Sequence, residues 1–184
     1  IEYGLGGYHM NLAAGGTSSA LALLDACDWI RAGRGSVALA GGFEALNPVL
    51  LAACTATGML AATHPAGAPF ARGRTGCVLG EGGCIVVLEE LAHALAREAV
   101  IFGELVVGAT GVGLARVMTN AARDADGLAP DAVLAAANGS LEADAAECNA
   151  IAVVPEVAAL PVTTVKPLLG ETLGAAGALQ LAAA

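Results

Sequence analysis

Apolar residues along the 184-residue chain recur in two kinds of run, each closed by glycine or proline. Short and almost continuous apolar runs are typical of strands buried on both faces, whereas apolar residues three or four apart are typical of helices. The predicted strands are residues 36–42, 84–89, 101–108, 132–137 and 161–165, and the predicted helices are residues 18–32, 47–57, 91–97, 114–125, 143–152 and 172–184. Strands that alternate with helices predict an α/β fold with a mixed or largely parallel sheet.

The starts of two predicted helices carry recognisable capping residues. Asn47 precedes Pro48 at the start of the helix 47–57, which is the usual order of an N-cap and a first helical residue. Ser18 stands at the start of the helix 18–32 and is also expected to act as a cap.

Composition raises two alternatives for the apolar surface. Hydrophobic residues make up 57% of the chain, charged residues 14%, and the mean hydropathy is +0.71. This composition favours a large partner interface, or else a membrane protein. The longest uncharged run, between Glu44 and Arg72, is interrupted by prolines and threonines, while a spanning helix needs about 20 predominantly apolar residues. We therefore expect no membrane role, and with no recognisable signal peptide a cytoplasmic location.

Charge and the spacing of possible metal ligands argue against several further kinds of binding function. The net charge of −9 and pI of about 4.6 disfavour nucleic acid as a partner. Five cysteines form no C-x-x-C pair and three histidines are dispersed, so we expect buried free thiols in a reducing compartment and no metal site. The early glycines follow no strand, so no dinucleotide cofactor is expected. His64 and His93 lie in a loop and a surface-helix context, where they fit capping better than catalysis.

Residues 11–33 have the form of a nucleophile turn. A Gly-Gly step leads into an apolar helix, and a helix N-terminus stabilises a reactive anion such as a thiolate. The residue at the reactive position is Ala14, which has no nucleophilic atom. Serines at the helix start have no G-x-S-x-G frame and no histidine placed to activate them.

Four landmarks occur in order along the chain. They are the turn around Ala14, Ala-Gly-Gly-Phe-Glu-Ala at 40–45, Pro-Phe-Ala-Arg-Gly-Arg-Thr-Gly-Cys-Val-Leu-Gly-Glu-Gly-Gly at 69–83, and Val-Lys-Pro-Leu-Leu-Gly-Glu-Thr-Leu-Gly-Ala-Ala-Gly-Ala at 165–178. Together they resemble the β-ketoacyl synthases, the thiolase-fold condensing enzymes of fatty acid and polyketide synthesis. The resemblance implies a layered αβαβα fold that is incomplete at both ends. It also implies that residues 1–100 are the latter part of the N-terminal half and residues 101–184 a truncated C-terminal half.

The resemblance also implies a Cys-His-His triad, and none of its members is present. In the family motifs, Ala14 occupies the position of the cysteine, Asn138 that of the first histidine and Glu171 that of the second. An alanine cannot attack a thioester and an asparagine amide cannot act as a general base. The loop before the helix 143–152 is about two residues shorter than the family pattern, and a loop between 111 and 114 is deleted. We therefore expect no intact catalytic residue.

Lys166 is retained from the family pattern and has two possible roles. It is either a remnant of the charge network around the histidines or a structural lysine paired with Glu147 or Glu171, and the second role is favoured because a buried lysine needs a carboxylate nearby. Glu81 is expected to stabilise a turn. Phe43 and Glu44 are expected to be packing and cap residues.

The chain keeps the family's motifs but lacks the Cys-His-His triad. In this it is similar to the chain-length factor, or ketosynthase β subunit, of type II polyketide systems. Chain-length factors often carry Gln where this chain has Ala14, so the resemblance to the aromatic-polyketide type is imperfect. Polyene-type systems, including aryl polyene systems, and fatty acid synthesis therefore remain alternative pathways. The implied partner is an active ketosynthase in a heterodimer, and acyl carrier protein would dock mainly on that partner. The helix and strand after Ala14 would form the dimer face. Candidate tunnel-lining residues are Leu50, Leu51, Met59 and Leu60.

Two other functions remain open from the sequence. One is an active acyltransferase with a moved nucleophile, such as Cys54 or Cys77. The other is a degenerate ketosynthase that only binds a carrier protein. The family is one of acyltransferases, and we expect this chain to be inactive alone and to work as a subunit of an active heterodimer.

Overall fold

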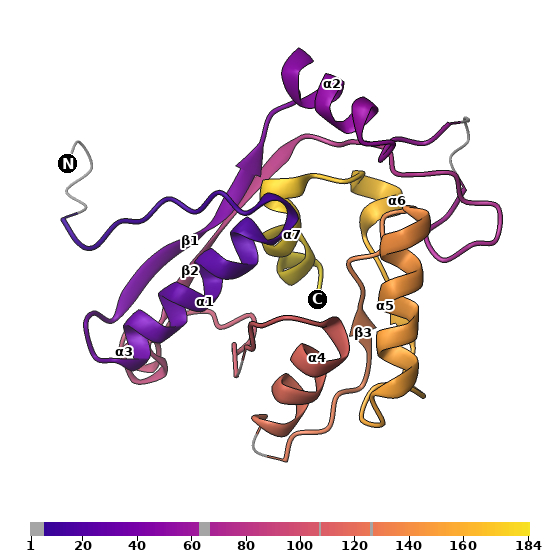
Figure 1. The fold of residues 1–184 in the computed structure, drawn as a ribbon. Coiled ribbons are helices and arrows are strands. Elements are labelled where there is room, and N and C mark those ends of the chain that lie inside the picture. Colours follow the sequence, from indigo (N-terminus) through magenta and orange to yellow (C-terminus); the bar gives the residue numbers. More distant parts are fainter. Residues whose placement is uncertain (1–5, 63–66, 107, 126) are drawn as a thin grey trace.

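In a computed structural model, which describes residues 6–62, 67–106, 108–125 and 127–184, the strands form two two-stranded sheets with helices packed beside them (Figure 1). The elements in chain order are η1 (Gly15–Thr17), α1 (Ser18–Arg31), β1 (Val37–Glu44), α2 (Pro48–Ala56), β2 (Gly82–Glu89), α3 (Leu91–Ala96), α4 (Leu114–Arg123), β3 (Val133–Leu134), α5 (Leu141–Val153), β4 (Val162–Thr163), α6 (Lys166–Leu169), η2 (Leu173–Ala175) and α7 (Ala176–Ala183). The predicted alternation of strands and helices is therefore confirmed in outline, with one strand missing. None of the described helices has the length and apolar character needed to cross a membrane.

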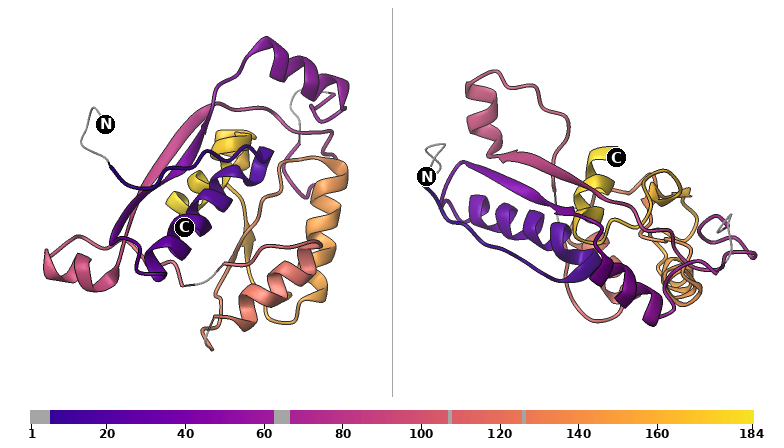
Figure 2. Two further views of the ribbon diagram at one scale, coloured as in Figure 1. Left: turned by 60° about the vertical axis from the view of Figure 1, so that its left-hand side comes forward. Right: turned by 90° about the horizontal axis from the view of Figure 1, so that it is seen from above.

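The main layer is an antiparallel pair of strands covered on one face by two helices. β1 and β2 pair from Val37 opposite Glu89 to Glu44 opposite Gly82. α1 runs alongside β1, and α7 lies next to α1 and against β2 (Figure 2). The buried core of this layer is formed by Leu23 of α1, Ala40 of β1 and Ala178 of α7.

Close packing of α1 and α7 depends on a glycine. A Cβ atom added to Gly177 would lie 2.8 Å from the backbone nitrogen of Ala20. The α7 backbone therefore approaches α1 more closely than any residue with a side chain would allow.

The opposite face of the strand pair is apolar and exposed. The exposed fractions are 56% for Leu39, 79% for Phe43, 60% for Ile85 and 59% for Val87. The expectation of strands buried on both faces is wrong for the described residues, because α1 and α7 both pack on the same side. Phe43 is consequently not a packing residue: alternation along β1 turns it toward the uncovered face.

The second sheet is smaller than predicted. β3 and β4 pair in parallel over two residues each, although strands were expected over 132–137 and 161–165. The described strands thus form two separate two-stranded sheets instead of one mixed sheet.

The predicted strand over 101–108 is wrong for the residues that the structure describes. Residues 101–106 adopt no regular structure, and the guanidinium of Arg31 binds them by donating to the carbonyl oxygens of Leu105 (3.0 Å) and Val106 (2.6 Å). Phe102 is 98% exposed. A strand needs a neighbour to receive its backbone hydrogen bonds, and no described strand pairs with this run.

Helix ends follow the capping chemistry of the sequence. The Asn47 side chain accepts hydrogen bonds from the backbone N–H groups of Val49 and Leu50, and Pro48 is the first residue of α2, as predicted. The helix closes at Gly58, whose φ of +69° lets Met59 N–H reach the Cys54 carbonyl oxygen (3.1 Å). Ser18, in contrast, bonds to the turn before α1, accepting from Ala14 N–H and donating to the Gly15 carbonyl.

Glu89, at the end of β2, holds α3 in place through Arg97 and His93. Arg97 donates to both carboxylate oxygens, at 2.8 and 2.7 Å, and His93 contacts the same carboxylate. These hydrogen bonds, that of Arg97 first, lower the pKa of Glu89 from 4.5 to about 2. His93 therefore pairs with a carboxylate, and His64 lies outside the described residues.

The depressed pKa predicts a pH-dependent contribution to stability. A carboxylate with a folded pKa below its unfolded value stabilises the fold above pH 4.5, and this contribution is lost as the pH falls from 4.5 toward 2. Glu89→Gln should lower the urea midpoint at pH 7, and its difference from the parent should shrink at pH 3. Glu104→Gln, an exposed control, should leave the midpoint unchanged at both values. A Glu89→Gln difference that is constant with pH would contradict the assignment.

Candidate functional site

Ala14 begins the turn that leads into α1. Its N–H donates to the Ser18 hydroxyl (2.8 Å), and its carbonyl oxygen accepts from the Thr17 hydroxyl (2.9 Å). The turn η1 packs against η2, which begins two residues after Glu171. The fold therefore brings the Ala14 turn to the segment that carries Glu171. The methyl side chain of Ala14 offers no group that could react there.

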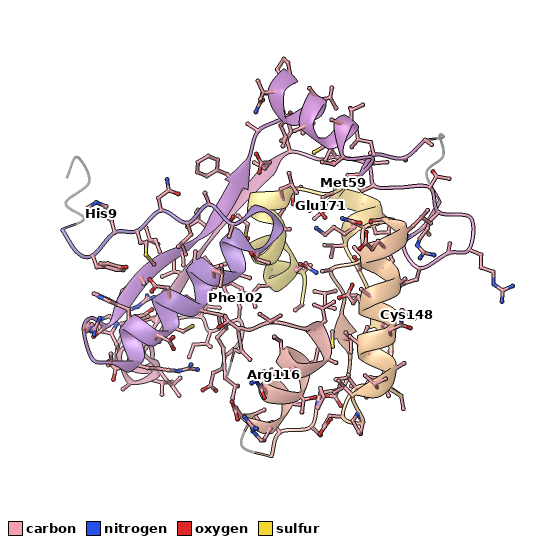
Figure 3. All side chains as sticks on the ribbon, in the orientation of Figure 1. His9, Met59, Phe102, Arg116, Cys148 and Glu171 are labelled. Atoms are coloured by element: carbon pink, nitrogen blue, oxygen red, sulfur yellow. The ribbon has the colours of Figure 1, made fainter. Side chains whose placement is uncertain are left out.

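Asn138, Glu171 and Lys166 form one hydrogen-bonded network (Figure 3 labels Glu171). Lys166 Nζ lies 2.8 Å from Glu171 Oε1, and both side chains are buried, with 4% and 7% exposed. Asn138 Nδ2 donates to Glu171 Oε2 at 2.7 Å. The Leu173 backbone N–H donates to Glu171 Oε1 at 2.9 Å. The carboxylate is thus fully engaged, and the predicted pairing of Lys166 with a carboxylate is confirmed with Glu171.

Glu147, the other predicted partner of Lys166, has a different role. Its Oε1 accepts a hydrogen bond from the Ala136 backbone N–H at 2.9 Å. Burial raises the pKa of Glu147 above the usual carboxyl range, and the backbone donors oppose this shift only in part. Glu147 therefore fixes the chain at the end of β3.

Asp144 is a second buried carboxylate beside the network, and it has 0% exposure. Its Oδ1 accepts from the backbone N–H groups of Asn138 (3.0 Å) and Gly139 (3.2 Å). Its Oδ2 accepts from Phe70 N–H (2.8 Å) and faces Arg74 Nε at 3.3 Å. Asp144 therefore connects the loop around residue 70 to the start of α5 and orients Asn138.

Arg74 completes this connection and was missed as a functional residue by sequence reasoning. Its guanidinium also donates to the carbonyl oxygens of Ala71 and Leu141, both at 3.0 Å. Arg74 lies within the 69–83 motif, which was the only sequence feature that could have singled it out. No sequence rule pairs Arg74 with Asp144, which is 70 residues further along the chain.

Glu81 and Glu44 were expected to act as turn and cap residues, and each accepts a backbone hydrogen bond. Glu81 accepts a hydrogen bond from Leu46 N–H (3.1 Å), as a turn-stabilising carboxylate would. Glu44 accepts from Gly174 N–H (3.1 Å) in η2. Both contacts agree with the predicted turn and cap roles.

The cysteines are all free, but not all are buried. Cys27, Cys54 and Cys77 are buried, Cys84 is half-buried and Cys148 is exposed on α5, which corrects the expectation for the last two. Burial, together with the nearby Glu171 carboxylate, raises the pKa of Cys77 to about 11. A thiol with this pKa is almost entirely protonated at neutral pH, which argues against Cys77 as a nucleophile. Among the described residues, no group of acidic, His and Cys side chains could hold a metal ion.

A widely open pocket of about 470 Å³ lies beside the segment that bridges to Glu171, and the side chains of its lining residues are apolar. Its lining residues are Leu46, Leu51, Leu60, Ala61, Ala62, Cys77, Val78 and Leu79. Two of the four predicted lining residues, Leu51 and Leu60, are among them. Leu50, which is half-buried, and Met59 are not among the lining residues.

The strand pair, its covering helices and the polar network define a thiolase-like mixed α/β fold of the ketoacyl-synthase class. Two family models account for most of the sequence: "Beta-ketoacyl synthase, N-terminal domain" matches residues 1–94 and "Beta-ketoacyl synthase, C-terminal domain" matches residues 104–184. The chain belongs to the β-ketoacyl synthase family. The expected boundary between residues 100 and 101 falls between the two matches and stays a prediction.

Three similar proteins illustrate the relationship. The chain is 31% identical over 202 residues to the chloroplastic 3-oxoacyl-[acyl-carrier-protein] synthase I of Hordeum vulgare, with 98% of this chain and 44% of the relative covered. A type II polyketide ketosynthase solved with its acyl-carrier protein and bound to the hexaketide superposes with a TM-score of 0.89 at 30% identity, covering 99% of this chain and 50% of that one. The ishigamide ketosynthase/chain length factor gives a TM-score of 0.85 at 31% identity, with coverages of 95% and 46%. The chain thus spans about half the length of these proteins or less.

Proposed function

We propose that the chain is the non-catalytic, chain-length-factor-type half of a ketosynthase heterodimer. The observation that carries this proposal is the hydrogen bond of 2.7 Å between Asn138 Nδ2 and Glu171 Oε2. In the proposal these two residues and Ala14 stand at the three positions of the family's Cys-His-His triad. The similarity to a solved ketosynthase/chain length factor supports the same assignment. The partner in this proposal supplies the cysteine and both histidines.

The chemistry of the three side chains explains why they would not condense acyl units. Ala14 has no lone pair to accept an acyl group. Asn138 has an amide nitrogen that donates but does not accept protons at neutral pH. The Glu171 carboxylate is negatively charged beside Lys166, so it would repel an enolate or thiolate that a neutral imidazole would stabilise.

The remaining role is to shape the space in which the partner's acyl chain grows. The apolar pocket beside Glu171 provides a wall for such a tunnel, with Leu51 and Leu60 on it. The net charge of −9 would weaken direct docking of an anionic acyl carrier protein, so the carrier would dock mainly on the partner. In this proposal residues 1–100 and 101–184 are parts of the two ketosynthase halves. The pathway would be type II polyketide synthesis, with aryl polyene synthesis as one form of it, or fatty acid synthesis, in the cytoplasm.

We also place the proposed dimer face on α1 and β1, the helix and strand after Ala14. The exposed apolar side chains of β1 support the part of this placement that concerns the strand, on the side opposite α1, since an apolar face of this kind favours a protein partner.

Co-expression with a ketosynthase encoded beside this chain tests the proposal. The two proteins should co-purify in a one-to-one ratio, and Leu39→Arg on β1 should abolish the complex. Leu168→Arg is a matched control, because Leu168 on α6 is 88% exposed and lies outside the proposed face. A chain that binds only carrier protein, with no ketosynthase, would instead support the degenerate carrier-binding function.

A further inference from the structure

The chain contains one Asn-Gly step, Asn138–Gly139, and it lies within the polar network around Glu171. Asparagine is one of the thermolabile residues, because its side-chain amide can be lost as ammonia. The loss is fastest before glycine, since no side chain there hinders attack by the glycine backbone nitrogen. The network is therefore built around a chemically labile step.

The fold requires both members of this step. Gly139 has a φ of +97°, and a Cβ atom added to it would lie 2.5 Å from the Gly76 carbonyl oxygen, so no residue with a side chain fits. Asn138 uses both ends of its amide: Nδ2 donates to Glu171 Oε2 at 2.7 Å, and Oδ1 accepts from the Ser140 N–H at 3.0 Å. An aspartate at position 138 would have no side-chain N–H to offer Glu171.

Deamidation of Asn138 consumes one water molecule and needs no other reactant. The Gly139 N–H loses its proton to hydroxide, and the nitrogen forms a bond to Asn138 Cγ. The bond between Cγ and Nδ2 then breaks, and Nδ2 takes a proton from water, which restores the hydroxide, and leaves as ammonia. Water opens the resulting cyclic imide at either carbonyl, which gives aspartate or isoaspartate at position 138.

Three contacts of the native network oppose this reaction. The Gly139 N–H donates to Asp144 Oδ1 at 3.2 Å, and this carboxylate is fully buried. A negative charge so close disfavours the amide anion that must form. The hydrogen bonds of the Asn138 amide to Glu171 and Ser140 also hold the side chain, so Cγ is kept from turning toward the Gly139 nitrogen.

We propose that Asn138 is a deamidation site that the native network suppresses and that opening of the network activates. The product carries a carboxylate where Nδ2 now contacts Glu171. Two carboxylates at hydrogen-bonding distance repel each other, and the new charge also competes for Lys166, so the original network does not re-form. Because the conversion is irreversible, it records each opening that led to reaction. This modification is independent of the proposed function.

Peptide mass spectrometry measures the converted fraction of Asn138 over time at pH 8. The whole chain is incubated folded and in guanidinium chloride, and a synthetic peptide of residues 132–144 in the same two solutions corrects for the solvent. The folded chain should deamidate at least tenfold more slowly than the peptide, and the denatured chain should match it. Equal rates in the folded chain and the peptide would overturn the proposal, and so would a denatured chain that does not react.

Asp144→Asn assigns the suppression to the network. The variant keeps the shape of the side chain and an acceptor oxygen but removes the charge beside the Gly139 N–H. Deamidation of Asn138 in this variant, shown to be folded by circular dichroism, should be at least tenfold faster than in the folded parent. A folded variant that reacts at the parent rate would contradict the role of Asp144. A variant that does not fold should react at the denatured rate, and a slower rate would contradict the proposal.

Asn138→Asp reproduces the product and tests its consequence. It should lower the urea midpoint at pH 7, because the new carboxylate faces Glu171. Asn11→Asp makes the same change at an exposed position and should leave the midpoint unchanged. Equal midpoints for Asn138→Asp and the parent would show that deamidation does not disrupt the network.

Discussion

Replacing Asp144 with alanine lowers the free energy of unfolding of the chain by about 3–5 kcal/mol, the range for removing one partner of a buried charged pair. The Asp144 carboxylate is fully buried and accepts hydrogen bonds from three backbone N–H groups, those of Phe70, Asn138 and Gly139. It also pairs with Arg74, which would be left as a largely buried charge without a carboxylate. Each of these donors loses its acceptor in the variant, and buried donors without acceptors are costly.

Urea denaturation followed by circular dichroism measures this loss. Asp28→Ala is the matched control, since Asp28 is 79% exposed and lies 3.9 Å from Arg31 in a surface pair. Surface pairs of this kind contribute about 0–1 kcal/mol, so the control should differ little from the parent. If Asp144→Ala were as mild as the control, the connection between the residue-70 loop and α5 would not be a stabilising one.

Replacing Glu171 with leucine destabilises the chain by a similar amount, about 3–5 kcal/mol. The substitution leaves the ammonium of Lys166 buried without its carboxylate, and Asn138 loses the acceptor for its side-chain N–H. The double variant Lys166→Met/Glu171→Leu removes both charges together. It should recover most of the lost stability, since well-packed apolar pairs often replace buried ion pairs without cost.

A double-mutant cycle of Lys166 and Glu171 separates this coupling from simple loss of packing. The two single variants and the double variant are unfolded in urea under identical conditions. The expected interaction energy is on the order of 1–3 kcal/mol, the range for residues in direct contact. Additive effects of the two substitutions would show that Lys166 and Glu171 do not stabilise each other.

Local sequence signals predicted the parts of the fold that depend on neighbours along the chain. Asn47 and Pro48 specified the start of α2 because an N-cap and a fixed φ act within one turn. The pairing of Lys166 with a carboxylate could be predicted because a buried lysine needs one nearby. The choice between Glu147 and Glu171 could not, and the fold selects Glu171.

Features that depend on distant neighbours could not be predicted in the same way. The apolar run 101–106 has the composition of a strand, but its conformation depends on whether another strand pairs with it. Phe43 was expected to pack because of its side chain, yet packing is decided by the side of the sheet on which α1 and α7 lie. The role of Arg74 depends on Asp144, which the fold alone brings within reach.

The central claim is that this chain carries no acyl group during condensation, and intact-protein mass spectrometry tests it most directly. The co-purified complex is incubated with acyl-loaded carrier protein, quenched in acid to preserve thioesters, and both subunits are weighed. The account predicts an acyl adduct on the partner ketosynthase and an unchanged mass for this chain. A thioester adduct on this chain, at Cys54, Cys77 or any other thiol, would contradict it.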